Sequence, residues 1–305
     1  MNPALNISRG QLVALVALTL MWGVNWPMMK FSLRELSPLY FRAVTMTSGA
    51  LLLYALYRAR GSAMHLPRAT WLPLLSLALP NILGWHLFSI LGVQELASGR
   101  AAILGFTMPI WTVLLSILFF GDRLTRRAVI SVACGSVAVA LLVAHEINSL
   151  AGRPLGILWM QIAAVSWALG TVLMRRTTLK LPTEAITVWM MLLSSLAFWV
   201  LAALFEPWPT WHFSGAMWAS LVWGAVINYG VAQVIWFGMA RSLAPQASTF
   251  AIMAVPLVGT LSAAFIVGEQ PRTLDVAAAG FIMLAIASAL LPRRAAPTPR
   301  ESARA

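Results

Sequence analysis

Two pairs of polar residues lie inside long apolar segments of the chain and share one spacing. Asn81 and Asn228 are 147 positions apart, and so are His86 and Gln233. A side-chain amide without a partner in an apolar interior costs free energy, so each should face a polar group, water or a bound molecule. We expect Asn81 and Asn228 to line a cavity and bind a small molecule. The alternative is a hydrogen bond between helices, which contributes about 0.6–2 kcal/mol.

His86 and Gln233 each follow an asparagine by five residues, which places them about 140° around a helix from it. One narrow face therefore cannot hold both members of a pair, although a wide cavity could. Both are kept as candidate binding residues. Because histidine titrates near neutral pH, His86 is either a proton-coupling group or a neutral, hydrogen-bonded histidine of the interior.

Tryptophan is the second candidate binding group. Trp22, Asn25, Trp26 and Met29 follow the i, i+3, i+4, i+7 spacing that places side chains on one helical face. Indole rings stack on planar molecules and on cations, but the chain has 14 Trp, many of which must serve packing or the membrane interface. The expected substrate-binding residues are Trp22, Asn25, Trp26, Asn81, Trp85, His86, Trp111, Trp167, Asn228 and Gln233.

A third matched pair consists of prolines. Pro109 and Pro256 are also 147 positions apart and fall near the middle of their apolar segments. Proline removes a backbone hydrogen bond and kinks or loosens a helix. We expect two helix kinks at equivalent positions, which are either hinges for a conformational change or fixed features of shape.

Chemistry beyond binding has little support in the sequence. No Asp or Glu lies in the middle third of an apolar segment, which argues against a carboxylate proton relay or sodium site. The patterns H-E-x-x-H, G-x-S-x-G and G-x-x-x-x-G-K-[ST] do not occur. We therefore expect no catalytic residue, no metal, no cofactor and no enzyme activity. Passive movement of a substrate, or coupling through His86, is the simpler expectation.

The elements that must position these residues are transmembrane helices. Hydrophobic residues make up 60% of the 305-residue chain and charged residues 10%, against roughly 25% charged in a soluble domain. The apolar runs reach the length of about 20 residues that crosses a bilayer, without the period-two alternation of a β-barrel. The sequence predicts an all-α integral membrane protein with ten transmembrane helices, at residues 11–31, 38–57, 71–92, 98–120, 127–144, 155–174, 185–205, 215–238, 245–267 and 273–291.

The basic residues indicate the orientation. With the N-terminus in the cytoplasm, 15 of the 21 Lys and Arg fall on the cytoplasmic side, and this excess places both termini inside. We expect a multi-pass protein of a bacterial-type inner membrane, surrounded by lipid and without a nucleic-acid partner. The first apolar segment is too long for a signal peptide. Cys134 is the only cysteine, so no disulfide forms within the chain.

The same spacing extends over a whole half of the chain. A shift of 147 residues aligns Gly121 with Gly268. A shift of 145 residues aligns Trp22 with Trp167. The shift covers five helices, an odd number, so the second half is inverted relative to the first, as in secondary transporters with a site at the midplane. The expected organisation is a first repeat at 1–144, a loop at 145–154, a second repeat at 155–291 and a basic, disordered tail at 292–305.

Together these features resemble the EamA family of the drug/metabolite transporter superfamily. The resemblance rests on ten helices in two repeats, the matched prolines, Gly-Asp at 121–122 or Gly-Glu at 268–269, and the Trp-Gly-Val-Asn-Trp run at 22–26. Within the family, the chain is most similar to the YddG-type exporters of aromatic amino acids. This implies a central cavity surrounded by helices one, three, four, six, eight and nine, and export of amino acids or related small metabolites. Asp122 stands where many relatives carry Glu.

Two other functions stay open. Transporters of anionic metabolites such as nucleotide-sugars belong to the same superfamily and need buried Lys or Arg to hold phosphate. Lys30, Arg42 and Arg100 are near the outer helix ends, so we expect no fixed positive charge at the centre. A membrane receptor or scaffold is the other rival, and the lack of large loops argues against it. The sequence does not decide the oligomeric state, and a monomer is compatible with it.

Overall fold

The computed structural model describes residues 8–121, 123, 125–148, 154–236 and 245–290, and every regular element within these ranges is helical. Each of the ten apolar segments expected from the sequence is represented by helix. Three of them are divided into consecutive helical pieces. The elements are α1 (Arg9–Ser32), α2 (Pro38–Ala59), η2 (Arg68–Thr70), α3 (Trp71–Ala78), η3 (Leu79–Gly84), α4 (Trp85–Glu95), α5 (Ser98–Gly105), α6 (Met108–Phe120), α7 (Arg126–Asn148), α8 (Pro154–Arg176), α9 (Thr183–Phe205), α10 (Gly215–Val222), η4 (Trp223–Val231), α12 (Pro245–Ile266) and α13 (Thr273–Leu290).

The helices have the length and the apolar surface of transmembrane segments. In the described part of the chain, eight helical spans are long and apolar enough to cross a bilayer, and α12 and α13 add two shorter apolar stretches. Large apolar side chains point outward, among them Leu118 (71% exposed), Phe205 (74%) and Phe265 (91%). An aqueous surface rarely tolerates contiguous apolar exposure, whereas lipid favours it. The expected all-α integral membrane fold is confirmed.

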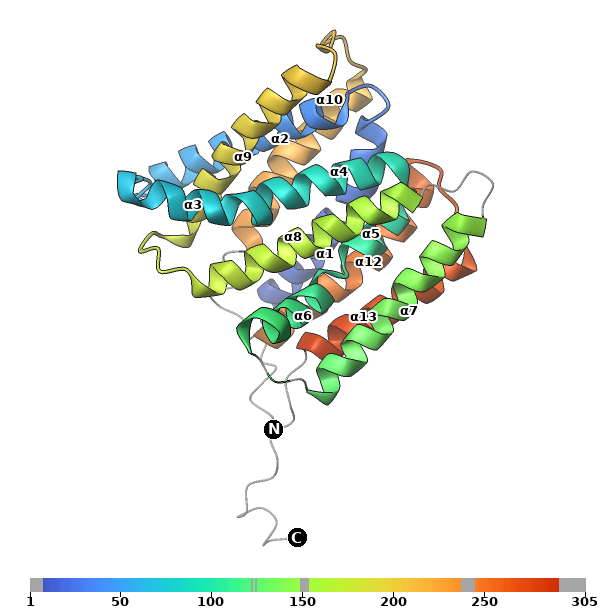
Figure 1. Cartoon of the computed structure of the whole chain (residues 1–305). Coiled ribbons are helices and arrows are strands. Elements are labelled where there is room, and N and C mark those ends of the chain that lie inside the picture. The colour runs from blue at the N-terminus through green and yellow to red at the C-terminus, as the bar shows by residue number, and fades with distance from the viewer. Residues whose placement is uncertain (1–7, 122, 124, 149–153, 237–244, 291–305) are drawn as a thin grey trace, which may run out of the picture.

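Helix packing pairs equivalent parts of the two halves. α1 packs along α12, and α8 packs along α5 and α6. A shift of about 147 residues carries α1 onto α8 and α5–α6 onto α12, so these two contacts correspond. α2 packs on α9, and α7 lies beside α13 on another side of the bundle (Figure 1). Gly121 and Gly268, at equivalent positions, both have positive φ, 71° and 76°, which glycine adopts without strain.

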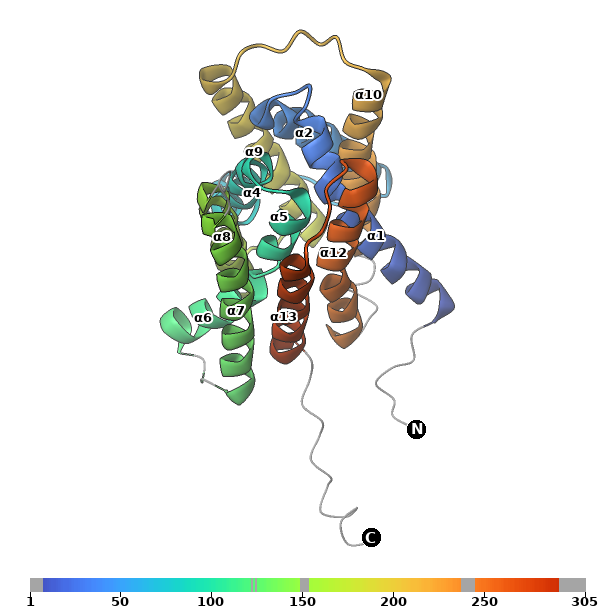
Figure 2. The same ribbon diagram turned by 90° about the vertical axis from the view of Figure 1, so that its right-hand side faces the viewer.

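The start of α1 and the end of α13 lie at the same end of the bundle (Figure 2). The loop between α9 and α10 lies at the opposite end, which we call the distal end. Three glutamates in distal loops accept hydrogen bonds from the first residues of helices other than their own. A carboxylate there satisfies N–H groups without a partner in the helix and complements the helix dipole. The contacts are Glu35 with the N–H and hydroxyl of Ser214 (2.8 and 2.6 Å), Glu206 with the N–H groups of Leu39 and Tyr40 (2.9 and 3.0 Å), and Glu269 with the N–H and hydroxyl of Ser98 (2.9 and 2.8 Å).

The two matched prolines have different surroundings. The segment expected as one helix at 98–120 is divided, because α5 ends at Gly105 and α6 begins at Met108. In a continuous helix the Pro109 ring would clash with the carbonyl of Gly105, whereas in the first turn of α6 its missing N–H has no cost. The chain is interrupted just before Pro109, at the two residues between α5 and α6, where the sequence predicts a kink. Pro256 lies inside α12, as expected.

Candidate functional site

The paired asparagines lie in two irregular helical segments. Asn81 is in η3 and Asn228 is in η4, and both segments have π-helical hydrogen bonding. Shifted by 147 residues, η3 falls inside η4. A π-helical turn interrupts the regular register of side chains and is frequent at functional sites. The spacing seen in the sequence therefore corresponds to a shared local backbone feature in the two halves.

Both asparagine side chains are buried, with 9% of Asn81 and 8% of Asn228 exposed. No hydrogen bond joins either amide to another residue in the described part of the chain. Asn81 packs directly on Gly170 of α8, where an added Cβ would lie 2.5 Å from the Asn81 Cβ. The missing side chain at Gly170 thus allows η3 and α8 to approach closely, so that Asn81 lies between the two halves.

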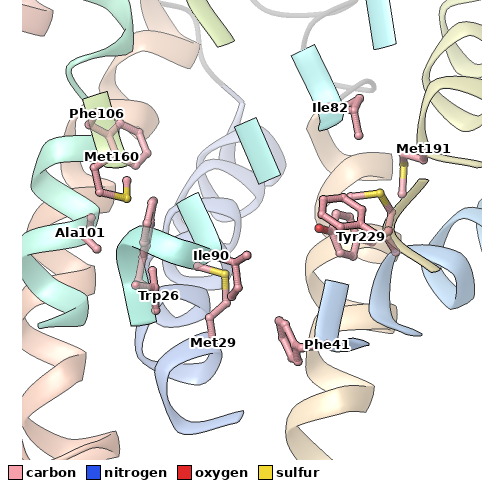
Figure 3. Packing of buried hydrophobic residues seen from close by; sticks show 14 of the residues in the cluster. Trp26, Met29, Phe41, Ile82, Ile90, Ala101, Phe106, Met160, Met191 and Tyr229 are labelled. Carbon is pink, nitrogen blue, oxygen red and sulfur yellow. The ribbon is translucent and has the colours of Figure 1, made fainter. Parts of the chain in front are cut away.

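Three of the expected tryptophans form a continuous aromatic row across the halves. Trp26 of α1 meets Trp85 of α4 edge to face, with ring centroids 6.3 Å apart at 90°. Trp85 meets Trp167 of α8 at 5.3 Å and 63°. Trp26 is buried and lies on the same side of the packed interior as Ala101 and Met160 (Figure 3), whereas Trp85 and Trp167 are half-buried. We call Trp26, Trp85 and Trp167 the indole row.

The other expected residues lie outside this row. Trp22 packs on Trp236, with ring centroids 5.4 Å apart. The indole N–H of Trp111 donates to Gln161 Oε1 at 2.9 Å, which ties α6 to α8. Two expected amides are half-buried: Asn25 in α1 and Gln233, which follows η4. The structure therefore brings only part of the expected set together.

His86 belongs to a polar network in the interior. Its Nδ1 lies 3.2 Å from the Tyr229 hydroxyl of η4. Arg42 of α2 donates to the Tyr229 hydroxyl (3.1 Å), to Ser89 Oγ (3.1 Å) and to the His86 carbonyl oxygen (3.2 Å). Arg42, Ser89 and Tyr229 are at most 2% exposed. Figure 3 shows Tyr229 across the interior from Trp26.

Sequence reasoning missed the inward reach of Arg42. The expectation that positive charge stays at the outer helix ends is wrong for this residue, because its side chain is 2% exposed. Arg42 lies in the second turn of α2, and a long arginine side chain can extend inward from such a position. One feature of the sequence could have indicated this position: Arg42 is the only basic residue between Pro38 and Tyr57, in an otherwise apolar segment.

A concave region lies away from the indole row. It is a recess of about 450 Å³ between the end of α2, the start of α3 and the side of α9. The Trp189 ring contacts the rings of Tyr54 and Trp71, at 6.1 and 6.3 Å, and its N–H donates to the Met64 carbonyl. None of the expected binding residues lines it. The lining residues are Tyr54, Arg58, Ala63, Met64, His65, Leu66, Trp71 and Trp189.

The groups of the indole row and of the Arg42 network are suited to binding rather than to bond making. They are aromatic faces, side-chain amides and one guanidinium, which recognise organic molecules by stacking and hydrogen bonding. Among the described residues, no group of three His, Cys, Asp or Glu side chains is placed to hold a metal ion.

Comparison with known proteins gives a consistent result. The profile of the EamA-like transporter family matches residues 9–144 and again residues 154–291. The uncharacterized inner membrane transporter YedA of Escherichia coli is 26% identical, over 90% of this chain and 88% of its own length. The aromatic amino acid exporter YddG of Ancylobacter novellus is 27% identical, over 83% of this chain and 85% of its own. A solved crystal structure with 21% identity shares the fold, with a TM-score of 0.66 over 92% of this chain and 96% of its own.

Proposed function

Since the chain belongs to the EamA-like transporter family, we propose that it exports amino acids, aromatic ones above all, across a bacterial inner membrane. The similarity to the aromatic amino acid exporter YddG supports this substrate class. The similarity to an inner membrane transporter supports the location. The excess of Lys and Arg on the side of the termini supports a cytoplasmic position for both.

The observation that carries the proposal is the indole row. Its members come from α1, α4 and α8, and therefore from both family matches. Aromatic pairs gain about 0.5–1.5 kcal/mol beyond the area that they bury, so an aromatic substrate could insert beside the half-buried Trp85 and Trp167. The Asn81 amide, at the contact between η3 and α8, is available for the polar part of the substrate.

The transport cycle follows from the position of this row between the halves. Secondary transporters with two inverted repeats move one half against the other around a fixed site. The π-helical segments η3 and η4 are the elements proposed to change shape, because a π-helical turn interrupts the regular helix and is frequent at functional sites. The described helices carry Asp and Glu only near their ends, which supports facilitative transport rather than coupling through a carboxylate.

Counterflow in proteoliposomes tests the proposal. Vesicles with purified protein and preloaded with unlabelled tryptophan should accumulate labelled tryptophan, and Trp167→Ala should abolish saturable uptake. Trp159→Ala is the matched control, since Trp159 is also a half-buried tryptophan of α8 and stacks on one aromatic ring of α4, Phe88, at 5.6 Å. Equal loss in both variants would contradict a site at the indole row.

The same vesicles test the driving force and the rival substrates. A facilitator should show the same rate of counterflow with and without an imposed pH gradient. Uptake only with the gradient would contradict facilitation and favour coupling through His86. Uptake of a labelled nucleotide-sugar without uptake of any amino acid would overturn the substrate class and leave the transporter family unaffected.

A further inference from the structure

The buried guanidinium of Arg42 has only neutral partners. They are the Tyr229 hydroxyl, the Ser89 hydroxyl and the His86 carbonyl oxygen, at 3.1, 3.1 and 3.2 Å. These three bonds use three of the five N–H groups that a guanidinium carries. Arg42 is 2% exposed, so bulk water screens its charge little.

Four carboxylates of the described chain have partners other than Arg42. In the distal loops, Glu35, Glu206 and Glu269 accept from the starts of α10, α2 and α5. Asp275 pairs with Arg100 at 2.7 Å. Within the described residues, no carboxylate forms an ion pair with Arg42. The interior therefore has an unmatched positive charge. Such a charge, taken out of water, costs several kcal/mol unless an opposite charge offsets it.

The network shares two helical elements with the other candidate binding groups. His86 follows Trp85 of the indole row, and Tyr229 follows Asn228 of η4. The hydrogen bonds of Arg42 connect α2 with α4 and also with η4 in the second half. An anion bound at Arg42 would therefore be held by α4 and η4, the elements that carry Trp85 and Asn228.

We propose that Arg42 binds the carboxylate of the transported amino acid, and that this carboxylate takes the place of the Tyr229 hydroxyl. The proposal rests on the proposed function, because it assigns the part of the substrate that every amino acid shares. A guanidinium fork matches a carboxylate in a bidentate, charge-assisted pair, whereas a hydroxyl offers one neutral acceptor. Release of Tyr229 removes a bond between the two halves, so substrate binding and movement of η4 are linked.

Selectivity between tryptophan and tryptophanamide tests this assignment, because the two differ only in a carboxylate replaced by a neutral amide. In wild-type vesicles, unlabelled tryptophan should compete with labelled tryptophan on the order of 10- to 100-fold better than the amide, the factor typical of a hydrogen bond to a charged group. Arg42→Gln should bring the ratio close to one. Arg42→Lys keeps the charge and should retain a preference for tryptophan.

Tyr229→Phe is the matched control for loss of the network. It removes the hydroxyl that competes for the guanidinium, so tryptophan should bind at least as tightly as in wild type. A large loss of tryptophan affinity in Tyr229→Phe would overturn the exchange, and this arm stays informative if Arg42→Gln does not fold. An unchanged ratio in a folded, transporting Arg42→Gln would overturn the assignment and leave the proposed function standing. Absence of tryptophan transport in wild type would overturn both.

Discussion

Replacing Gly170 by alanine should force α8 and η3 apart at Asn81. The added Cβ would lie 2.5 Å from the Asn81 Cβ and 2.6 Å from its Cα, whereas ordinary contact begins at 3.4 Å. Neither Asn81 atom belongs to a flexible chain end, so the two helices must separate by about 1 Å in a close-packed interior. Overpacking of this kind costs about 1–3 kcal/mol.

Gly280 of α13 supplies the matched control. It is also helical, and no atom lies within 4 Å of a Cβ added there. Alanine stabilises a helix by up to about 1 kcal/mol relative to glycine, and this stabilisation applies at both positions. The difference in unfolding free energy between Gly170→Ala and Gly280→Ala should therefore isolate the clash and amount to about 1–3 kcal/mol.

The assay is equilibrium unfolding of the purified protein in mixed micelles, followed by tryptophan fluorescence. Gly170→Ala should be the less stable variant, and it should also transport tryptophan more slowly because Asn81 is displaced. Equal unfolding free energies for the two variants would refute the close contact between η3 and α8. Normal transport by a destabilised Gly170→Ala would show that Asn81 does not contribute to the site.

Three further predictions concern the charged groups. Glu269→Gln removes the charge at the start of α5 and should lower the free energy of unfolding by about 0.5–2 kcal/mol, and an unchanged unfolding midpoint would contradict this role. The bonds from the Ser214 hydroxyl and N–H hold the pKa of the Glu35 carboxyl below its usual range. The ionised carboxylate therefore stabilises the fold above the pKa of the unfolded state, and this stabilisation is lost as pH falls through the pKa of the folded state. Hydrogen exchange at the start of α10 should therefore be faster in Glu35→Gln than in wild type at neutral pH and equal in strong acid, and a difference that persists in acid would contradict this. Asp275→Asn removes the charge paired with Arg100 and should cost about 3 kcal/mol, and a loss below about 1 kcal/mol in the same unfolding titration would contradict a structural role for the pair.

The helices could be predicted because lipid imposes a simple rule. Every backbone polar group must be satisfied within the membrane, so each long apolar run forms a helix. The expected helix at 11–31 is found at Arg9–Ser32, and the expected helix at 185–205 is found at Thr183–Phe205. Their ends extend a little further because the polar residues next to an apolar run can continue the helix into the interface.

The local irregularities could not be predicted, because they depend on contacts between helices. The π-helical turn around Asn81 has no composition of its own, and it is accommodated where Gly170 of a distant helix leaves room. The break before Pro109 was expected only as a kink, since the sequence does not show whether a helix bends or restarts.

The candidate site was predictable in residue type more than in arrangement. Trp26, Trp85 and Trp167 were expected near a substrate and form the indole row. Trp22 was grouped with Trp26 by helical spacing, yet it packs on Trp236. Helical spacing specifies a shared face but not the neighbour that covers each part of it. The buried position of Arg42 depends on a long side chain that crosses from one helix to another, which spacing along one helix cannot reveal.

The central claim is that an aromatic amino acid binds at the indole row, between the two halves. A structure with a brominated tryptophan, located by the anomalous scattering of bromine, tests it most directly. The account predicts bromine next to Trp85 and Trp167, with the carboxylate toward Arg42. Bromine in the recess lined by Trp71 and Trp189, with none at the indole row, would contradict it.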